Sequence, residues 1–469
     1  MQVNWVSRLK DVLSAWLFPA LLIGSHLNSL SVYFSSDEPM NIYNIWNPPL
    51  WKVGLAQLMF WSDFIRPLSV IYYLPLFHFA DFNQAPYAVT RMVLLLVNAA
   101  IFFSLAKCLS RSWWIATLAT LPVAYHAGLS YLVYSGAFIY DILCGTFYFA
   151  ALLYYVRLRA RGTPLRTPHL AVFLGLYICS LNSKEMAVTL PVLVLAYELL
   201  FKGRNARFGP VLIAAAITAI FILGKTGHGT LTDTEAYRPV FTWARYAESN
   251  IRYLNSIFYT GTFTIQRVLL LWGVLLYAGV RQLRRARPDP RWLFLWVWVV
   301  VTPLPITFLP LRGGAMLYVV VPGWAMLAAL VCRSLARRIS RDIVFQGIPR
   351  QAVMLLALAG CLFAYTHETR RKDRAAIESN LSIGKDTREL VNELREINIQ
   401  PAAGSRILFL NDPFPEAWTT FFVATLLWKD PTLHINLQNQ VHLVPEETAH
   451  MDYVIDFADK HFFIVRKPL

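Results

Sequence analysis

The sequence is poor in charged residues and in cysteine. Only 15% of its 469 residues are Asp, Glu, Lys or Arg, whereas soluble globular domains carry about 25%. No Cys-x-x-Cys pair occurs, and the five cysteines lie in or beside apolar stretches. A disulfide framework and a zinc site are therefore not expected. The polar C-terminal part lacks a glycine-rich phosphate loop, so nothing supports nucleotide binding.

Apolar residues make up 56% of the chain, and long apolar stretches recur through its first three quarters. A run of about 18 or more apolar residues is typical of a membrane-spanning helix. We therefore predict a polytopic α-helical membrane protein with about eleven transmembrane helices. The expected spans are 12–34, 86–107, 113–132, 138–156, 168–182, 186–201, 209–224, 263–280, 292–310, 314–332 and 350–366. A shorter apolar piece at 67–80 is expected to be re-entrant, interfacial or part of a bent helix.

Basic residues cluster between alternate spans, and the formal net charge is +15. With eleven spans, all the main clusters fall on one side, which the positive-inside rule assigns to the cytoplasm. We interpret them as orientation signals, and we expect membrane lipids and no nucleic acid as partners. The prediction is an integral membrane protein, in a bacterial inner membrane, with its N-terminus cytoplasmic and its C-terminal domain periplasmic. The equivalent outer side in an endoplasmic reticulum protein would be the lumen.

Two adjacent carboxylates, Asp37 and Glu38, follow the first expected span in an outer loop at 34–66. The stretch Trp46–Trp61 behind them has Trp at both ends and apolar residues at helical spacing, which indicates an interfacial helix. A carboxylate at this depth can act as a general base. The alternative is that the pair caps the helix or is simply solvated.

Further ionisable residues are expected near the same face, where they are costly and often functional. The candidates are carboxylates that could act as acid or base and cations that could hold a phosphate. Two histidines are also candidates, although packing is the more usual role for such residues. These candidates are Asp141, Lys184, Glu185, Arg312, His78 and His126. Carboxylates together with cations suit transfer from a lipid-phosphate donor, and they would also suit ion-coupled transport.

Several segments resemble the C-type (GT-C) membrane glycosyltransferases, which use polyprenyl-phosphate sugars. The chain is most similar to the protein O-mannosyltransferases and their transmembrane, tetratricopeptide-bearing relatives, over roughly residues 10–335. The carrying features are the acidic pair Asp37-Glu38 in the first outer loop, RPLSVIYYLPLFHF from Arg66 to Phe79, and SKEMAVTLPVLVLAYELLF from Ser183 to Phe201. Tetratricopeptide repeats are not found after them, and LRGGAMLYVVVP stands where those relatives carry an Arg-Tyr-x-Tyr segment.

The resemblance implies inverting transfer of a sugar from a polyprenyl-phosphate donor to a hydroxyl of a glycan, lipid or protein acceptor. It implies Asp37 as general base, Glu38 as an orienting residue, and Asp141 as the acid of the second outer loop. Around the donor phosphate it implies Lys184 and Glu185, with Arg66 and the offset Arg312 as further candidates. Some members of the family need a divalent metal such as Mg²⁺ or Mn²⁺ and others do not, so no metal ligand is assigned.

The chain divides into a membrane domain, 1–366, with a further outer loop at 225–262, and a charged C-terminal region, 367–469. In that region RILFLND, HINLQ, YVIDF and HFFIVR are expected strands, with a helical AWTTFFVATLLW, giving a small extracytoplasmic α/β domain. It would cap the active face or recognise the acceptor. Two other functions stay open: a lipid or solute transporter or flippase, and a ligase or polymerase that joins whole glycans.

Overall fold

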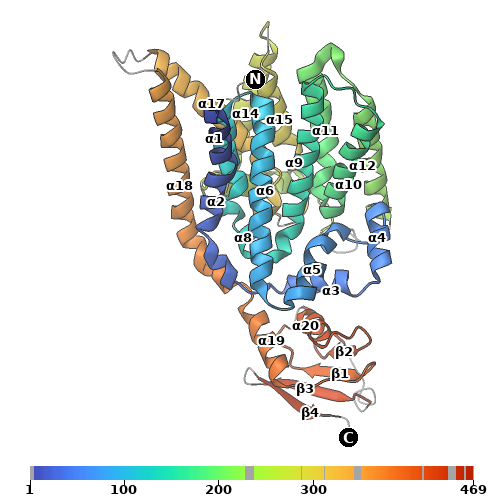
Figure 1. The fold of residues 1–469 in the computed structure, drawn as a ribbon. Helices are drawn as coiled ribbons and strands as arrows, with labels where there is room; N and C mark the ends of the chain where they lie inside the picture. Colours follow the sequence, from blue (N-terminus) through green and yellow to red (C-terminus); the bar gives the residue numbers. More distant parts are fainter. Residues whose placement is uncertain are drawn as a thin grey trace.

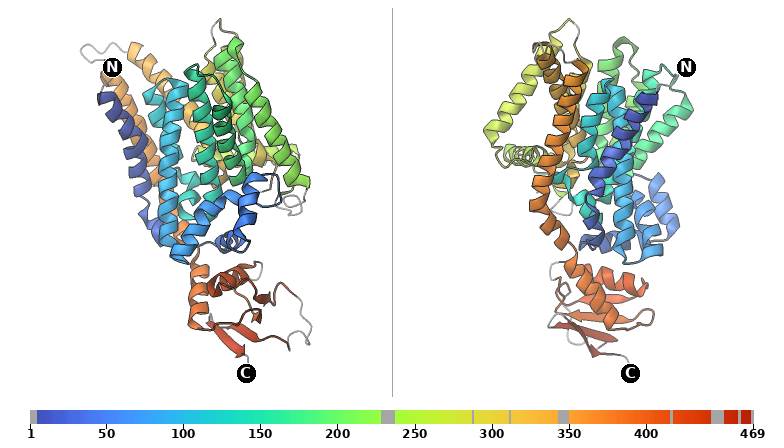
Figure 2. Two further views of the ribbon diagram at one scale, coloured as in Figure 1. Left: turned by 45° about the vertical axis from the view of Figure 1, so that its right-hand side comes forward. Right: turned by 60° about the vertical axis from the view of Figure 1, so that its left-hand side comes forward.

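The computed structural model describes most of the chain. The described residues are 5–227, 237–286, 288–310, 312–342, 350–414, 417–441, 450–458 and 461–467. A bundle of long helices forms the larger part, and a small domain hangs below one end of it (Figures 1 and 2).

The bundle is built from helices that follow the expected spans. They are α1 (Trp5–Val12) and α2 (Phe18–Gly24), joined by a π-helical turn, α6 (Gln84–Ser110), α7 (Trp113–Ala124), α8 (Tyr131–Tyr134), α9 (Ile139–Ala160), α10 (Thr167–Ser183), α11 (Leu190–Tyr197), α12 (Gly209–Gly227), α14 (Ile265–Leu283), α15 (Pro290–Val301), α16 (Leu304–Thr307), α17 (Val321–Asp342) and α18 (Arg350–Ser382).

Six helical segments of the described chain are long and apolar enough to cross a membrane. They are Gln84–Ser110, Gly136–Ala160, Glu185–Asn205, Gly209–Gly227, Pro290–Thr307 and Gln351–Asp373. The protein is therefore an integral membrane protein, as predicted. Helix also forms in each of the other expected spans, but there it is shorter, more polar or interrupted. The number eleven stays a prediction.

The first span ends earlier along the chain than predicted. The helix ends at Gly24, and a 3-10 turn follows at Leu27–Ser31, where the sequence pattern had suggested helix up to residue 34. The hydroxyl of Ser25 donates to the carbonyl of Leu22 at 2.7 Å, and the His26 ring lies 2.9 Å from the same oxygen. Side-chain hydrogen bonds of this kind compete with the backbone ladder and end the helix.

Three short helices lie at the end of the bundle that faces the C-terminal domain, which we call the outer end after its predicted orientation. The sequence predicted an interfacial helix at 46–61 and a separate apolar segment at 67–80. The three helices are α3 (Asp37–Trp46), α4 (Leu50–Leu58) and α5 (Val70–Ala80). Pro48 and Pro49 separate the first two, because proline cannot donate the backbone hydrogen bond that would continue a helix. The acidic pair consequently begins a helix of its own, which the sequence analysis did not foresee. The predicted outer loop 225–262 also contains a helix, α13 (Trp243–Ile257).

Helix α6 occupies the middle of the bundle, with α7 and α9 packed along it (Figure 1). Small residues such as Ala99 and Ala106 are fully buried on it. Small side chains let helix backbones approach closely. This close packing favours association of helices in a membrane, where the lipid tails are as apolar as the helices themselves. The amide of Asn98, also on α6, donates to the carbonyl of Ile142 on α9 at 3.0 Å.

The C-terminal domain is a four-stranded sheet with order β2-β1-β3-β4. Its elements are α19 (Lys385–Glu396), β1 (Arg406–Leu410), α20 (Thr419–Trp428), β2 (His434–Leu437), β3 (Tyr453–Ala458) and β4 (His461–Arg466). Strand β1 runs parallel to β2 and β3, and β4 is antiparallel to β3. The predicted small α/β region is confirmed. Helix α18 passes through residue 367 and continues to Ser382, so a continuous helix leads from the bundle to this domain.

The domain docks on α3 through α20 (Figure 1). The ring of Tyr43 on α3 lies 5.6 Å from that of Phe421 and 5.3 Å from that of Phe422. At the junction of α18 and α19, Gly384 has a φ of +76° and lies against the backbone of Tyr33 and Phe34. Any side chain at Gly384 would be strained by the left-handed backbone conformation and would also clash with the backbone of Tyr33 and Phe34.

We predict that Gly384→Ala loosens the docked domain. A Cβ at this position would lie 2.4 Å from the carbonyl oxygen of Phe34, in addition to a left-handed backbone cost of about 1–2 kcal/mol. The rate of tryptic cleavage near Lys385 and Arg388 should rise. Gly404→Ala is the matched control, because its φ is also +76° but no heavy atom lies within 4 Å of the added Cβ. Equal cleavage rates in the two variants would contradict the role of the Gly384 contact.

Candidate functional site

The two adjacent carboxylates have opposite environments. Both lie in the first turn of α3, yet Asp37 is exposed and Glu38 is only 2% exposed. One oxygen of Glu38 accepts hydrogen bonds from the backbone N–H and the hydroxyl of Ser35, at 2.8 and 3.1 Å. None of the described residues forms a hydrogen bond or ion pair with the side chain of Asp37. The pair therefore divides into a free carboxylate and an anchoring one.

The Glu38 side chain packs against Gly136 and lies near Arg91. A Cβ placed on Gly136 would lie 1.8 Å from Oε1 of Glu38 and 3.1 Å from Nη1 of Arg91, so both side chains pack on this glycine. Arg91, on α6, is 3% exposed and donates to the hydroxyl of Tyr72 at 3.2 Å. Burial raises the pKa of Glu38, and the nearby Arg91 guanidinium opposes that rise. The bonds to Ser35 and the burial of Glu38 therefore hold the start of α3 in place.

A buried ion pair joins two further predicted residues. Nζ of Lys184 lies 2.6 Å from Oδ2 of Asp141, and the two side chains are only 7% and 3% exposed. Lys184 ends α10, and Asp141 lies in the first turn of α9. Breaking such a pair by removing one partner leaves an uncompensated buried charge, which costs about 3–5 kcal/mol. The pair therefore ties the outer ends of these two helices together.

A second ion pair lies beside the first and is more open. Nε and Nη2 of Arg66 donate to the two oxygens of Glu185, at 3.2 and 3.1 Å. The side chains are 14% and 29% exposed. Arg66 has left-handed φ and ψ of 51° and 54° and precedes Pro67. Non-glycine residues held in this region cost roughly 1–3 kcal/mol and cluster at functional sites.

Two aromatic rings extend this pair toward another predicted residue. The guanidinium of Arg66 lies 5.0 Å from the ring centre of Tyr140, and that of Arg312 lies 4.5 Å from the ring centre of Tyr237. Tyr237 in turn lies close enough to Arg66 to interact with it electrostatically. Arginine stacking on tyrosine keeps the charge while covering one face of the guanidinium. Arg312 is thereby brought to the same end of the molecule as Arg66.

Tyr73 connects the acidic helix to this cation cluster. Its hydroxyl donates to the carbonyl of Gly136 at 3.0 Å and accepts from the amide of Asn41 on α3, at 3.4 Å. Its ring centre lies 6.3 Å from that of Tyr140, over which Arg66 is stacked. Residues from α3, α5, α9 and α10 therefore form one continuous polar region at the outer end of the bundle.

The two histidine candidates do not join this region. His78 is exposed on α5, with its ring 4.9 Å from that of Phe79. His126 is buried and stacks on Tyr259 at 4.3 Å; Nδ1 accepts from the Gly128 N–H at 3.1 Å, and Nε2 lies 3.1 Å from the carbonyl of Ile257. Both contacts suit a neutral imidazole. Burial lowers the pKa of His126 to about 4.

Sequence reasoning missed several residues that complete the site. They are Tyr73, Arg91, Tyr140 and Lys225; the last is 6% exposed, and its Nζ donates to the carbonyls of Ser62 and Phe64 at 2.5 and 2.7 Å. Arg91 offered a signal, since an arginine inside an apolar run is costly unless it is paired. The tyrosines offered none, because tyrosine is common at membrane interfaces.

The acidic residues of this region do not fit a divalent cation. Mg²⁺ and Mn²⁺ bind through oxygen ligands that converge on one point. Glu38 is buried and bonded to Ser35, Asp141 is paired with Lys184 and Glu185 with Arg66, so these three carboxylates are already engaged. Among the described residues no three His, Cys, Asp or Glu side chains gather at metal-binding distance. No catalytic step is therefore derived through a metal.

Comparison with known proteins adds evidence on the fold. No protein-family model matches the sequence, and no curated protein matches it. Among solved structures, the chain is similar to the archaeal oligosaccharyltransferase AglB from Archaeoglobus fulgidus, solved in complex with an inhibitory peptide and a dolichol-phosphate. The TM-score is 0.54 at 11% identity, covering 97% of this chain and 70% of that chain. The likeness concerns the fold alone; it supports the predicted GT-C architecture, and the closer similarity to protein O-mannosyltransferases stays a prediction.

We predict that His126 makes folding sensitive to mild acid. The pKa of its ring is lower in the folded state than in an unfolded chain, so stability present above pH 6.5 is lost as the pH falls toward 4. The shift corresponds to about 3 kcal/mol. In thermal unfolding of the purified protein, wild type should exceed His126→Asn in Tm at pH 7. That difference should shrink toward pH 4, and a constant difference would refute the assignment.

Proposed function

We propose that the protein is an inverting membrane glycosyltransferase. It would move a sugar from a polyprenyl-phosphate donor to an acceptor hydroxyl on the outer, periplasmic side of a bacterial inner membrane. The observation that carries the proposal is the exposed, unpaired carboxylate of Asp37 at the end of a polar region that also holds a cluster of cations. The GT-C-like fold supports it.

Asp37 is suited to the role of general base. A base must be free to accept a proton and must be held at a fixed point beside the acceptor. Asp37 has no described partner, while its neighbour Glu38 pins the same helical turn through Ser35 and Gly136. An acceptor hydroxyl that loses its proton to Asp37 can attack the anomeric carbon as the phosphate leaves from the opposite face. In-line displacement of this kind inverts the configuration of the sugar.

The cation cluster is suited to the phosphate leaving group. Four cations, Lys184, Arg66, Arg312 and Lys225, gather around three carboxylates, Asp141, Glu185 and Asp63, so these seven groups carry a net charge of +1. Preorganised positive charge stabilises the developing charge on a leaving phosphate. Arg66 belongs to the more exposed ion pair and is assigned the direct contact. Lys184 and Asp141, both buried, would set the position of the cluster.

An apolar cavity offers a place for part of the polyprenyl chain. It measures about 260 Å³ and lies between α13, α14, α15 and α16, lined by residues including Trp272, Leu276, Trp296 and Val300. Helix α16 packs on the segment Glu185–Thr189, which carries the phosphate candidate Glu185. A lipid tail in this cavity would therefore have its phosphate end directed toward the cations. AglB was solved in complex with a dolichol-phosphate, a lipid of this class.

A second candidate function is the transfer of a whole glycan to a peptide. It is favoured by the likeness to AglB, an oligosaccharyltransferase that was solved with a bound inhibitory peptide. The C-terminal domain packs on α3, the helix that carries Asp37, which places it where it could contact either kind of acceptor. Acceptor recognition by this domain is part of the proposal.

Transport fits the arrangement less well. A transporter needs a polar path that opens to both sides of the membrane. At the other end of the bundle, Glu198 is fully buried and bonded to Arg159 at 2.6 Å, to Tyr155 at 2.8 Å and to the backbone N–H of Arg207 at 2.8 Å. These contacts make Glu198 part of a structural ion pair and leave no free carboxylate at that position, whereas Asp37 has no described partner.

We predict that Asp37→Asn lowers turnover by about 10²–10⁴-fold, the usual contribution of a general base. Release of lipid phosphate would be followed for purified protein in lipid with a panel of polyprenyl-phosphate monosaccharides and of pyrophosphate-linked glycans. Asp386→Asn is the control, because Asp386 is also an exposed Asp in the first turn of a helix. Full activity of Asp37→Asn would remove Asp37 as base. Turnover of pyrophosphate-linked glycans alone would favour the second candidate.

We predict that the double variant Arg66→Gln/Glu185→Gln folds but loses at least about tenfold in turnover of the donor. Removing both charges leaves no unpaired charge behind, so stability should change little. Removing one cation from the leaving phosphate should cost turnover. Thermal unfolding and turnover would be measured on the same preparation. A normal Tm with normal turnover would exclude Arg66 from the donor site.

A further inference from the structure

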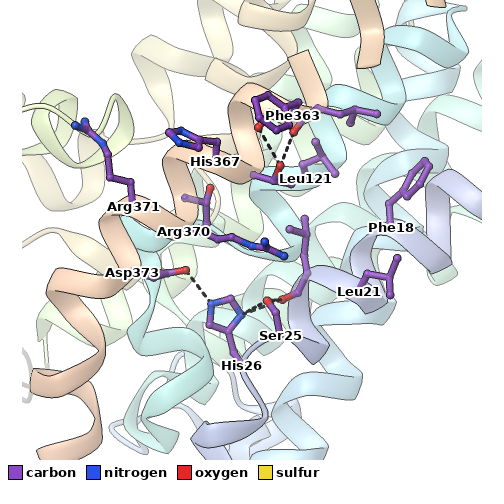
Figure 3. A pocket seen from close by; sticks show the side chains of 14 residues that line it. Phe18, Leu21, Ser25, His26, Leu121, Phe363, His367, Arg370, Arg371 and Asp373 are labelled. Carbon is purple, nitrogen blue, oxygen red and sulfur yellow. Dashed lines mark hydrogen bonds and ion pairs between the residues drawn. The ribbon is translucent and has the colours of Figure 1, made fainter. Parts of the chain in front are cut away.

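A large cavity lies away from the proposed active site. It measures about 690 Å³ and is bounded by α2, α7 and α18 (Figure 3). These helices lie on the opposite flank of the bundle from α10 and α12 in Figures 1 and 2. Ligand pockets are typically about 300–1,000 Å³, so this cavity can hold most of a small ligand or part of a lipid.

The cavity is apolar at one end and polar at the other. On α2 the lining runs from Phe18 and Leu22 to Ser25, and on α18 it runs from Phe363 to Arg370. Both helices lead toward the outer end of the bundle, so the polarity changes in the same direction on both walls (Figure 1). A molecule that matches this wall has an apolar tail toward the bilayer centre and a polar head toward the outer surface.

The polar end offers one arginine without a described partner, because its acidic groups are bonded to other residues. Both oxygens of Asp373 accept hydrogen bonds, from His26 at 3.0 Å and from the Tyr125 hydroxyl at 2.5 Å. Glu368 accepts from Arg371 at 2.6 Å. None of the described side chains pairs with Arg370, whose guanidinium extends toward α2 above His26 in Figure 3. A negative group would therefore find an available guanidinium at this end.

Helix α18 is poorly covered by protein where it borders the cavity. Only 11% of the most apolar stretch of Gln351–Asp373 is buried inside the protein. Its lower half is held by the bonds of Asp373 and by Asn380, whose amide donates to the hydroxyl of Ser130 at 3.0 Å. Since the same helix continues to the C-terminal domain, whatever fills the cavity also supports the connection to that domain.

We propose that this cavity is a binding site for an anionic phospholipid of the outer leaflet. The phosphate binds Arg370, and an acyl chain lies along the apolar residues of α2 and α18. This site is distinct from the proposed donor site and does not depend on the proposed activity. Charge-assisted hydrogen bonds from a guanidinium to a phosphate provide the selectivity.

The test is native mass spectrometry of the full chain released from micelles that contain equimolar phosphatidylglycerol and phosphatidylcholine with identical acyl chains. Wild type should retain phosphatidylglycerol at least about tenfold more than phosphatidylcholine, the effect of one charge-assisted contact. Arg370→Gln should lose most of that preference. Arg267→Gln is the control, because Arg267 is an exposed arginine on α14 that donates to the carbonyl of Thr262 and does not line the cavity. Leu22→Trp, which fills the apolar end, should reduce retention of the phospholipid.

The other outcomes would overturn the proposal. Equal retention of the two lipids, or an unchanged preference in Arg370→Gln, would show that the cavity does not select an anionic headgroup through Arg370. Displacement of the lipid by glycerol phosphate alone would indicate a site for a soluble phosphate. Stronger retention of a polyprenyl phosphate than of phosphatidylglycerol would assign the cavity to a donor lipid instead.

Discussion

The outer end of this protein depends on one constraint: charges close to the membrane must be paired. Asp141 is ion-paired with Lys184 and Glu185 with Arg66, while the buried Glu38 is bonded to Ser35 and lies within electrostatic reach of Arg91. An isolated charge in a low-dielectric environment costs several kcal/mol, so each partner fixes the other and the helices that carry them. These three contacts join α3, α6, α9 and α10, together with the turn that precedes α5.

Pairing also explains why a single carboxylate remains available. Asp37 and Glu38 are neighbours in a helical turn, so their side chains leave the axis in directions about 100° apart. With Glu38 directed into the protein, Asp37 has to face the aqueous side. A general base requires a free carboxylate on a backbone that is held in place. Here the geometry of the helix provides both, with Asp37 free and Glu38 anchored.

The sequence predicted the class of the protein because long apolar runs and basic clusters are local signals. It also predicted the strands of the C-terminal domain, since RILFL, HINL and YVIDF are short β-branched and aromatic runs between polar segments. Helix ends were less predictable. The first span stops at Gly24 because Ser25 and His26 bond back to the carbonyl of Leu22, and hydropathy carries no trace of such bonds.

Composition and spacing by themselves determined that this is a membrane protein with costly charges near one face. Only the tertiary structure decided which of those charges meet. Arg66 and Glu185 are 119 positions apart, and Asp141 and Lys184 are 43 apart. Arg91 belongs to the site although it lies within a span, whereas His126 is a buried neutral packing residue. The physical reason is that an ion pair depends on distance in space and on burial, and neither quantity is encoded in the local pattern of residues.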